Sequence, residues 1–320
     1  MSGERGRVRR LGFGSANAGN LYEPMSDEQA EELFTAAWEA GVRHFDTAPH
    51  YGLGLAEERL GRFLAQRPRD EFFLSTKVGR LVVAGPSAPT SDAQGFKVSH
   101  GRGRVVDYSR DGVRRSLAES LQRLGLDRVD AVYVHDPEQL GDELITEHLT
   151  SAIPACQELR DEGVVDRIGV GSCAVPALQA GVEHGGIDEV MAAGVFTLLT
   201  QRAYPELLAA CDATGVQVLA TAPFNSGLLA THPPRADSHF DYGDVPDEQF
   251  EQALELAGIC QRYGVELPTA ALQFPLRYEP CRMVVTGAAT PEQVRETTSR
   301  MSEPVPDELW VELRRLGHIP

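Results

Sequence analysis

Short apolar runs alternate with amphipathic stretches along nearly the whole chain of 320 residues. The apolar runs favour β-strands because they are rich in β-branched and aromatic residues. Eight strands are predicted, at Leu11–Ser15, Arg43–Thr47, Phe72–Val78, Ala131–His135, Arg167–Ser172, Val190–Thr197, Val216–Ala222 and Arg282–Gly287. Helical periodicity is clearest over Asp27–Ala40, Ser109–Leu124 and Ala152–Glu162.

Local signals mark where some of these helices begin and end. Ser26 followed by Gln29 predicts a capping box at the start of the first helix. Gly41 and Gly163 stand where glycine is expected just after a helix.

Strands that alternate with helices imply parallel β-α-β units. Eight such units in a chain of this length predict an α/β protein, a closed (β/α)8 barrel of the TIM-barrel class, with one domain covering residues 1–320. A doubly wound dinucleotide-binding sheet is the alternative, and it needs G-x-G-x-x-G at its first strand–helix turn. Gly12 and Gly14 supply two of these glycines, but Asn17 stands in place of the third. We therefore favour the barrel.

Two long segments, Arg80–Val106 and Ala230–Val245, interrupt the alternation. Both lack a clear periodicity, and both follow a predicted strand. They should therefore lie on the C-terminal face of the barrel, where active sites are found. Loops of this length in a compact domain are usually functional or mobile.

Charge and composition narrow the class of partner. The chain has 47 acidic and 30 basic residues, a formal net charge of −17, which disfavours nucleic acid and anionic membranes as partners. A hydrophobic content of 42% allows a sizeable core, yet no apolar run approaches the ~20 residues of a membrane span. The basic N-terminus is followed by no apolar segment, so no secretion signal is expected.

Cysteine and histidine spacing gives no sign of a metal site. The five cysteines are scattered without a CxxC pair, and neither H-x-H nor H-E-x-x-H occurs. A metal-dependent barrel hydrolase is therefore disfavoured, and so is a disulfide framework. A reducing cytoplasmic location is expected. The oligomeric state is not predicted.

Candidate chemistry gathers where predicted strands end. Asp46, Lys77 and His135 lie at the ends of three successive strands, and Tyr51 lies in the loop after Asp46. In a barrel these ends converge on one mouth. Taken singly, Asp46 reads equally well as a turn cap, and Tyr51 and His135 read more readily as ordinary half-buried side chains.

Lys77 is harder to explain as a structural residue. A lysine within an apolar strand is costly unless it is paired, and Lys77 and Lys97 are the only lysines among 30 cationic residues. This usage indicates a need for a compact ammonium group. A neighbouring ammonium lowers the pKa of a tyrosine from its usual ~10. With Asp46 to orient Lys77 and a histidine to bind a substrate oxygen, the set predicts general acid/base catalysis on a carbonyl/alcohol pair.

The sequence resembles the aldo-keto reductase family over nearly its whole length. The resemblance is carried by FDTAPHYGLGLAEERLGRFL, STKVGR, DYSRDGVRRSLAESLQRLGLDRVD and VYVHDP. It implies Tyr51 as the acid/base, Lys77 and Asp46 as groups that tune it, and His135 as a ligand of the substrate oxygen. It also implies hydride transfer between a nicotinamide and a carbonyl or alcohol carbon, without a metal.

The amino-acid sequences of these motifs are most similar to those of the branch of aldose 1-dehydrogenases and pyridoxal dehydrogenases. This branch implies oxidation of an aldose at C1 to a lactone, with a small sugar or aldehyde as substrate. An aldehyde or ketone reductase and a non-catalytic cofactor-binding barrel subunit are the alternatives. Substrate contacts are expected from Tyr51 and His135 and, by position, from Asn20, Tyr22, Phe224, Tyr242 and the Arg80–Val106 segment.

The resemblance also implies NAD or NADP as cofactor. The expected contacts are Gly14, Ser15, Ser172, Thr197, Pro223, Phe224, Ser226, Gly227, Leu228, Gly287, Ala288, Ala289, Gln293, Glu296 and Thr297. Ser172 and Ala193 replace an Asn and a Gln that are common in the family. NAD is favoured because Gly287 and Gln293 stand where an NADP-binding branch has Lys and Arg, although Arg235 offers another cation.

Overall fold

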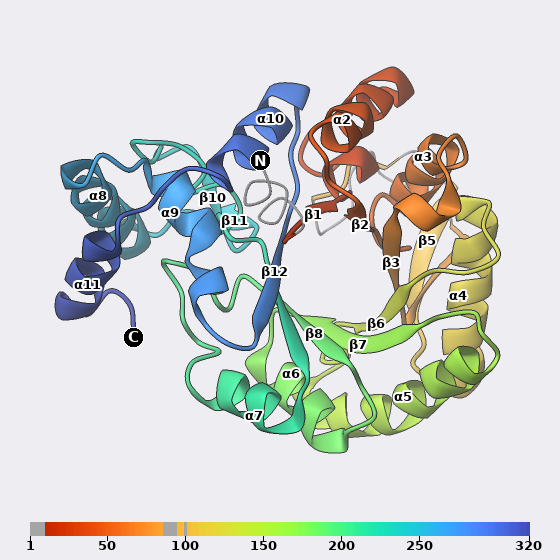
Figure 1. Ribbon diagram of the computed structural model, residues 1–320. Helices are drawn as coiled ribbons and strands as arrows, with labels where there is room; N and C mark the ends of the chain where they lie inside the picture. Colours follow the sequence, from red (N-terminus) through yellow and green to blue (C-terminus); the bar gives the residue numbers. More distant parts are fainter. Residues whose placement is uncertain (1–9, 86–94, 99–100) are drawn as a thin grey trace.

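The computed structural model describes residues 10–85, 95–98 and 101–320. Within these ranges eight parallel strands close into a barrel in the circular order β1-β12-β9-β8-β7-β6-β3-β2 (Figure 1). Their bounds are β1 Leu11–Gly14, β2 His44–Asp46, β3 Phe73–Val78, β6 Ala131–His135, β7 Arg167–Ser172, β8 Glu189–Ala193, β9 Gln217–Thr221 and β12 Cys281–Thr286. The predicted (β/α)8 barrel is confirmed, and each of the eight expected strands is present.

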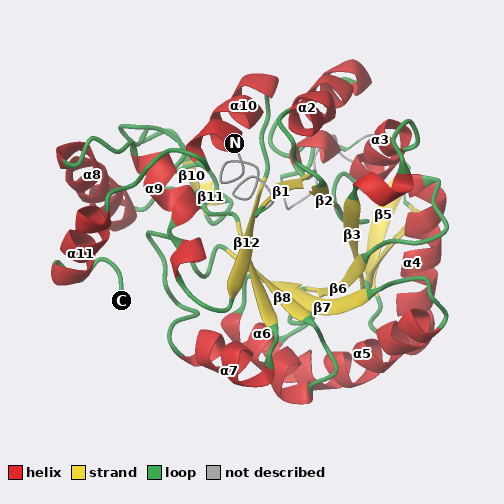
Figure 2. Ribbon diagram, in the orientation of Figure 1, coloured by secondary structure: helices red, strands yellow, loops and turns green. Residues whose placement is uncertain are grey.

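Helices surround the barrel, as the red ribbons of Figure 2 show. Their bounds are α2 Asp27–Glu39, α3 Leu55–Leu64, α4 Arg110–Leu124, α5 Ile145–Asp161, α6 Val175–His184, α7 Glu206–Thr214, α8 Asp247–Arg262, α9 Leu267–Gln273, α10 Pro291–Arg300 and α11 Asp307–Arg315. Short 3-10 turns lie at Asn17–Gly19, Arg69–Glu71, Asp142–Leu144 and Pro275–Arg277. Within the described ranges, no helix has the length and apolar character that crossing a bilayer requires.

The predicted helix caps are confirmed. Ser26 accepts a hydrogen bond from the backbone N–H of Gln29 at 3.2 Å, and the Gln29 side chain accepts one from the Ser26 N–H at 2.8 Å. Gly41 and Gly163 follow α2 and α5 with φ of 90° and 77°. This left-handed backbone favours glycine and ends each helix.

Strand β8 is shorter than the sequence predicts. It ends at Ala193, and Phe196 and Thr197 lie beyond it in an irregular segment. Gly194 adopts a left-handed φ of 67°, which turns the chain away from the strand direction. The apolar residues that follow Gly194 are buried although they are not in a strand. A strand prediction based on hydrophobicity therefore continued past the true end of β8.

Both long segments contain paired strands, so the expectation of aperiodic loops was wrong at their ends. Arg80–Ala84 (β4) pairs antiparallel with Arg102–Val106 (β5), and His239–Phe240 (β10) pairs with Gly243–Asp244 (β11). The middle of the first segment, residues 86–94 and 99–100, lies outside the described residues. The β4–β5 pairing joins residues far apart in sequence, and no local periodicity reveals it. Because β4 follows β3 directly, this hairpin stands at the C-terminal mouth.

The interior of the barrel is closed below the mouth by a small apolar cluster. Its buried members are Ala131, Tyr133, Met191, Leu219 and Val285. Beneath it, the Tyr133 hydroxyl donates to Glu189 at 2.5 Å, and Glu189 pairs with Arg167 at 3.3 Å. Polar side chains at the mouth therefore rest on a packed floor rather than on an open channel.

Two helical glycines have opposite surroundings and give a test of the packing between α3 and α4. A Cβ atom added to Gly61 in α3 would lie 2.6 Å from the Leu124 Cα atom, at the end of α4. A Cβ atom added to Gly258 in α8 would meet no atom within 4 Å. We expect Gly61→Ala to lower the free energy of unfolding by ~1–3 kcal/mol because the helices must separate. Gly258→Ala should raise it by up to ~1 kcal/mol, the difference in helix propensity.

Denaturant unfolding of the two variants beside the wild type measures both changes. Equal effects of the two substitutions would contradict the close approach of α3 to α4.

Candidate active site

Asp46 and Lys77 form a buried ion pair on two neighbouring barrel strands. β2 ends at Asp46 and pairs with β3, which carries Lys77. The Lys77 Nζ atom donates to Asp46 Oδ2 at 2.6 Å and to the Thr47 carbonyl oxygen at 2.9 Å. The second carboxylate oxygen of Asp46 accepts a hydrogen bond from Ser75 at 2.7 Å. Both charges are thus hydrogen-bonded as well as paired, which buried charges require.

Tyr51 lies between β2 and α3, directly over this pair. The Lys77 Nζ atom is 4.7 Å from the Tyr51 ring centroid, and the two side chains are hydrogen-bonded. Burial raises the pKa of Tyr51 above its ordinary value, while the Lys77 charge acts to lower it. Burial lowers the pKa of Lys77, but the charges of Asp46 and Tyr51 outweigh burial and leave that pKa raised. The sequence analysis predicted that Lys77 would lower the pKa of Tyr51. The pKa is raised instead, because the effect of burial, which the sequence does not reveal, exceeds that of the Lys77 charge.

His135 ends β6, the strand beside β3. Its ring meets the Tyr51 ring edge-on, with centroids 6.1 Å apart. Burial lowers the pKa of His135 well below its ordinary value, and the charges of Arg80 and Lys77 lower it further. The imidazole is therefore neutral, and its buried Nδ1 atom has no hydrogen-bond partner within the described chain. The structure thus brings all four predicted catalytic side chains to one mouth.

A second ion pair, between Arg80 and Asp136, supports the strand end at His135. Arg80 donates to the Asp136 carboxylate and, at 2.7 Å, to the side-chain oxygen of Gln139. Tyr108 donates to the carbonyl oxygen of His135 at 2.7 Å and to that of Asp136. Asp136 has a φ of 45°, a left-handed conformation that these contacts hold in place.

His50 and Arg104 also lie at the mouth; the sequence analysis did not name His50 and included Arg104 only within the Arg80–Val106 segment. An Arg104 guanidinium nitrogen lies 2.6 Å from His50 Nδ1. The His50 ring centroid is 5.7 Å from that of His135 and 5.1 Å from that of Phe96. Burial lowers the pKa of His50 to about 2, together with the charges of Arg80 and Arg104. The position of His50 beside Tyr51 was a signal, but its partner comes from β5, more than fifty residues away.

Ser172 ends β7, beside the end of β6. Its hydroxyl donates to Glu138 Oε1 at 2.6 Å and accepts from the Ala174 N–H at 2.8 Å. The other oxygen of Glu138, Oε2, is buried and has no partner among the described residues. Burial raises the pKa of Glu138 above its ordinary value. Glu138 is a further mouth residue that the sequence analysis did not name.

The other predicted cofactor residues on this side differ in exposure. Gly14 ends β1, and the buried Ser15 hydroxyl has no partner within the described ranges. The Thr197 side chain is fully buried and donates to Asn225 at 2.7 Å. Leu228 is fully buried in the core. The side chains of Thr197 and Leu228 are therefore occupied by packing, and the expectation that they contact a cofactor stays a prediction.

The loop after β9 brings the second long segment to the mouth. Asn225 and Ser226 have left-handed φ values of 47° and 59°, and Gly227 has one of 118°. The Ser226 hydroxyl accepts a hydrogen bond from the Tyr242 N–H at 3.1 Å. Pro223 is buried and Phe224 half-buried beside them. Across the mouth, the predicted substrate residue Tyr22 stacks on His239 of β10 with centroids 4.5 Å apart.

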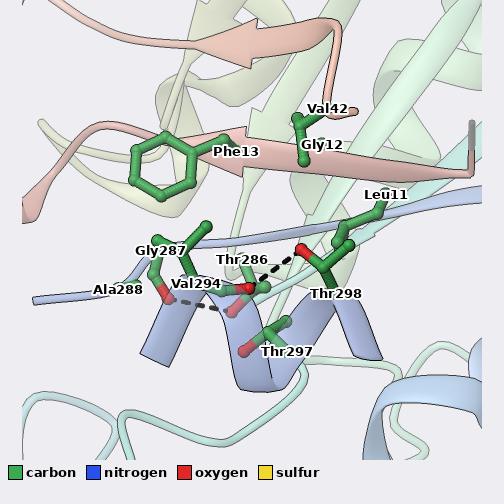
Figure 3. Close-up of a pocket in the computed structure, with 10 residues that line it drawn as sticks. All are labelled: Leu11, Gly12, Phe13, Val42, Thr286, Gly287, Ala288, Val294, Thr297 and Thr298. Atoms are coloured by element: carbon green, nitrogen blue, oxygen red, sulfur yellow. Dashed lines mark hydrogen bonds between the residues drawn. The ribbon is translucent and has the colours of Figure 1, made fainter. Parts of the chain in front are cut away.

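The remaining predicted cofactor residues surround the start of α10. A Cβ atom added to Gly287 would lie 3.2 Å from the Gly14 carbonyl oxygen at the end of β1 and 2.9 Å from Asn17 Oδ1 in the turn that follows, so the backbones approach closely here. Gln293 accepts a hydrogen bond from the Ala289 N–H at 2.7 Å. Figure 3 shows a pocket of about 10 Å³ here, lined by Leu11, Gly12, Phe13, Val42, Thr286, Gly287, Ala288, Val294, Thr297 and Thr298. This space is no larger than one water molecule. Gln293 and Glu296 lie exposed on α10.

Among the described residues, no group of three or more His, Cys, Asp or Glu side chains is arranged to hold a metal ion.

Comparisons with known proteins agree with this architecture. The model of the aldo/keto reductase family matches residues 10–317. The chain is 44% identical to a D-threo-aldose 1-dehydrogenase of Pseudomonas sp and 36% identical to a pyridoxal 4-dehydrogenase of Microbacterium luteolum. Each match covers 98% of this chain and 95% of the relative.

Among solved structures, a glycerol dehydrogenase from Gluconobacter oxydans has the same fold, with a TM-score of 0.76 at 21% identity. That match covers 97% of this chain and 93% of the other. The chain therefore belongs to the aldo/keto reductase family and is an NAD(P)-dependent oxidoreductase.

Proposed function

We propose that this enzyme oxidises an aldose at C1 to a lactone, with NAD as cofactor and Tyr51 as the proton acceptor. The observation that carries the proposal is the buried Lys77–Asp46 pair beneath Tyr51. An aldose is proposed as the substrate because the chain is 44% identical to a D-threo-aldose 1-dehydrogenase over 98% of its length. Oxidation of the anomeric hydroxyl of a cyclic aldose removes one hydride from C1 and one proton from the hydroxyl oxygen.

The proton passes to the Tyr51 oxygen. Burial makes the phenolate costly, and the Lys77 ammonium is the group that stabilises it. Asp46 keeps Lys77 charged and fixes its position through the 2.6 Å hydrogen bond. The pair therefore keeps the pKa of Tyr51 below the value that burial alone would give, which favours its use as a general base.

His135 orients the reacting oxygen. Because its imidazole is neutral, one ring nitrogen donates a hydrogen bond and the other accepts one. Its edge-on contact with Tyr51 places both side chains around a single oxygen at the mouth. His135 thus aligns the hydroxyl for proton transfer without taking the proton itself.

The residues at the mouth fit a nicotinamide cofactor. The unpartnered buried oxygens of Ser15 and Glu138 offer hydrogen bonds to its polar groups. The start of α10 offers backbone N–H groups to its phosphates. A nicotinamide held by these residues would supply the hydride acceptor for C1.

NAD is favoured by the charges at the start of α10. Gln293 stands where a cation would bind the 2′-phosphate of NADP, and its side-chain oxygen faces the Ala289 N–H. Glu296 is exposed nearby. Arg235, the alternative cation, forms an ion pair with Asp237 of its own loop at 2.6 Å. Gln293 and Glu296 carry no positive charge, and Arg235 is already paired, so none of the three supplies a cation for a 2′-phosphate.

Other parts of the sequence analysis stay predictions. They are the cytoplasmic location, the single-domain organisation and the absence of nucleic-acid and membrane partners. Reduction of aldehydes or ketones remains the alternative direction.

The first prediction concerns Tyr51 and the substrate together. With an aldose and NAD, we expect formation of the reduced cofactor and a lactone. Tyr51→Phe should lower turnover by ~10²–10⁴-fold because it removes the proton acceptor while keeping the ring. Absorbance of the reduced nicotinamide measures both, and cofactor affinity of the variant should stay near that of the wild type.

Activity confined to apolar aldehydes or to pyridoxal, with none on any aldose, would overturn the proposed substrate. Near-normal turnover of Tyr51→Phe would overturn the proposed mechanism.

The second prediction concerns Lys77. We expect Lys77→Arg to lower turnover by ~10²-fold or more, because the larger planar guanidinium displaces the Tyr51 oxygen by about 1 Å. Lys77→Met also removes the charge that counters burial at Tyr51. The pKa of Tyr51 should then rise further, and the rising limb of oxidation against pH should move to higher pH.

Profiles of turnover against pH for the wild type and both variants separate geometry from charge. A wild-type rate and profile for Lys77→Arg would show that Lys77 is an ordinary structural cation.

The third prediction concerns cofactor choice. The oxidised form of NAD should bind more tightly than that of NADP, and Gln293→Arg should narrow the difference by supplying a cation for the 2′-phosphate. Fluorescence titration of each protein with each cofactor gives the dissociation constants. A strong preference of the wild type for NADP would reverse the proposal.

A further inference from the structure

His50 is a buried polar ring at the mouth that the proposed chemistry leaves without a role. Only 7% of its surface is exposed, and its ring lies within 6.2 Å of the Tyr51 ring and 5.7 Å of the His135 ring, centroid to centroid. It therefore lies beside the two side chains that surround the reacting oxygen. Phe96 packs against both His50 and Tyr51, with ring centroids 5.1 Å and 5.9 Å away.

Arg104 determines which nitrogen of His50 carries the proton. A guanidinium group only donates hydrogen bonds, so the Nδ1 atom at 2.6 Å from Arg104 is the acceptor. The His50 ring is neutral, since burial and the nearby cations lower its pKa to about 2. Its single hydrogen is therefore on Nε2. The Arg104 contact is the one hydrogen bond of this ring within the described chain, which leaves the Nε2–H group available to an oxygen.

We propose that His50, oriented by Arg104, binds the hydroxyl group on the carbon next to the reacting carbon and so selects aldoses and other 2-hydroxy aldehydes. The inference rests on the proposed function for its choice of aldoses. The Nε2–H group of His50 is a fixed donor beside Tyr51 and His135, which surround the reacting oxygen. It is therefore suited to bind a second substrate oxygen, on the carbon next to the reacting carbon. Aldoses carry such an oxygen, whereas simple aldehydes and 2-deoxy sugars do not.

The test is the ratio of kcat/KM for an aldose to kcat/KM for its 2-deoxy analogue. We expect the wild type to favour the aldose by roughly tenfold, the effect of one well-made hydrogen bond. His50→Leu should bring the ratio close to one, mainly through a higher KM for the aldose. His50→Gln should recover part of the ratio, because its amide N–H group reaches a similar position.

Two arginines of β5 form a matched pair of controls. Arg104→Met should lower the ratio, because the His50 ring loses the contact that fixes its orientation. Arg102 donates instead to the Leu53 carbonyl oxygen and pairs with Glu58, so Arg102→Met should leave the ratio at the wild-type value.

A structural role for His50 gives a different result. If His50→Leu lowers kcat/KM equally for both sugars, or if His50→Gln and His50→Leu give the same ratio, the inference is overturned. If the wild type oxidises no aldose, the proposed function fails, but the inference is still tested by the reduction of 2-hydroxypropanal against propanal. A wild-type preference for 2-hydroxypropanal that His50→Leu abolishes would support it, and an unaltered ratio would refute it.

Discussion

The buried hydrogen bond between Lys77 and Asp46 fixes the geometry of the mouth. Removing both charges from water costs several kcal/mol per ion, roughly, and the cost is offset only where each charge is paired and hydrogen-bonded. The register of β2 and β3 meets this condition by setting Asp46 opposite Ser75. Lys77 lies two residues beyond Ser75 and so projects from the same face of β3. Tyr51 then lies over the Lys77 ammonium group, whose position is fixed by its hydrogen bonds to Asp46 and Thr47.

Cations gather at the mouth although the molecule as a whole is acidic. The chain carries a formal net charge of −17, yet Lys77, Arg80 and Arg104 gather around Tyr51 and the two histidines. These cations and burial together keep His50 and His135 neutral, so both rings offer hydrogen bonds without titrating near neutral pH. Among them, Lys77 also opposes the cost of forming a phenolate at Tyr51. The cations at the mouth thus affect both the acid/base chemistry at Tyr51 and the hydrogen bonds that His50 and His135 offer to a substrate.

The strand ends and the hairpin have separate tasks in this arrangement. The barrel supplies Asp46, Lys77 and His135 from strands whose positions are fixed by continuous parallel pairing. The β4–β5 hairpin supplies Arg104, which contacts His50. Because loops beyond a barrel vary without disturbing its core, the hairpin is suited to determine the substrate while the strand ends determine the reaction.

The sequence by itself determined the alternation of strands and helices, and with it the barrel and the convergence of Asp46, Lys77 and His135. These features are local: apolar runs mark the strands, and parallel topology brings their ends together. Only the tertiary structure decided the turn at Gly194, the pairing of β4 with β5, the contact of Arg104 with His50, and the raised pKa of Tyr51. Each of these depends on burial or on contacts between residues distant in sequence, and no pattern along the chain encodes either one locally.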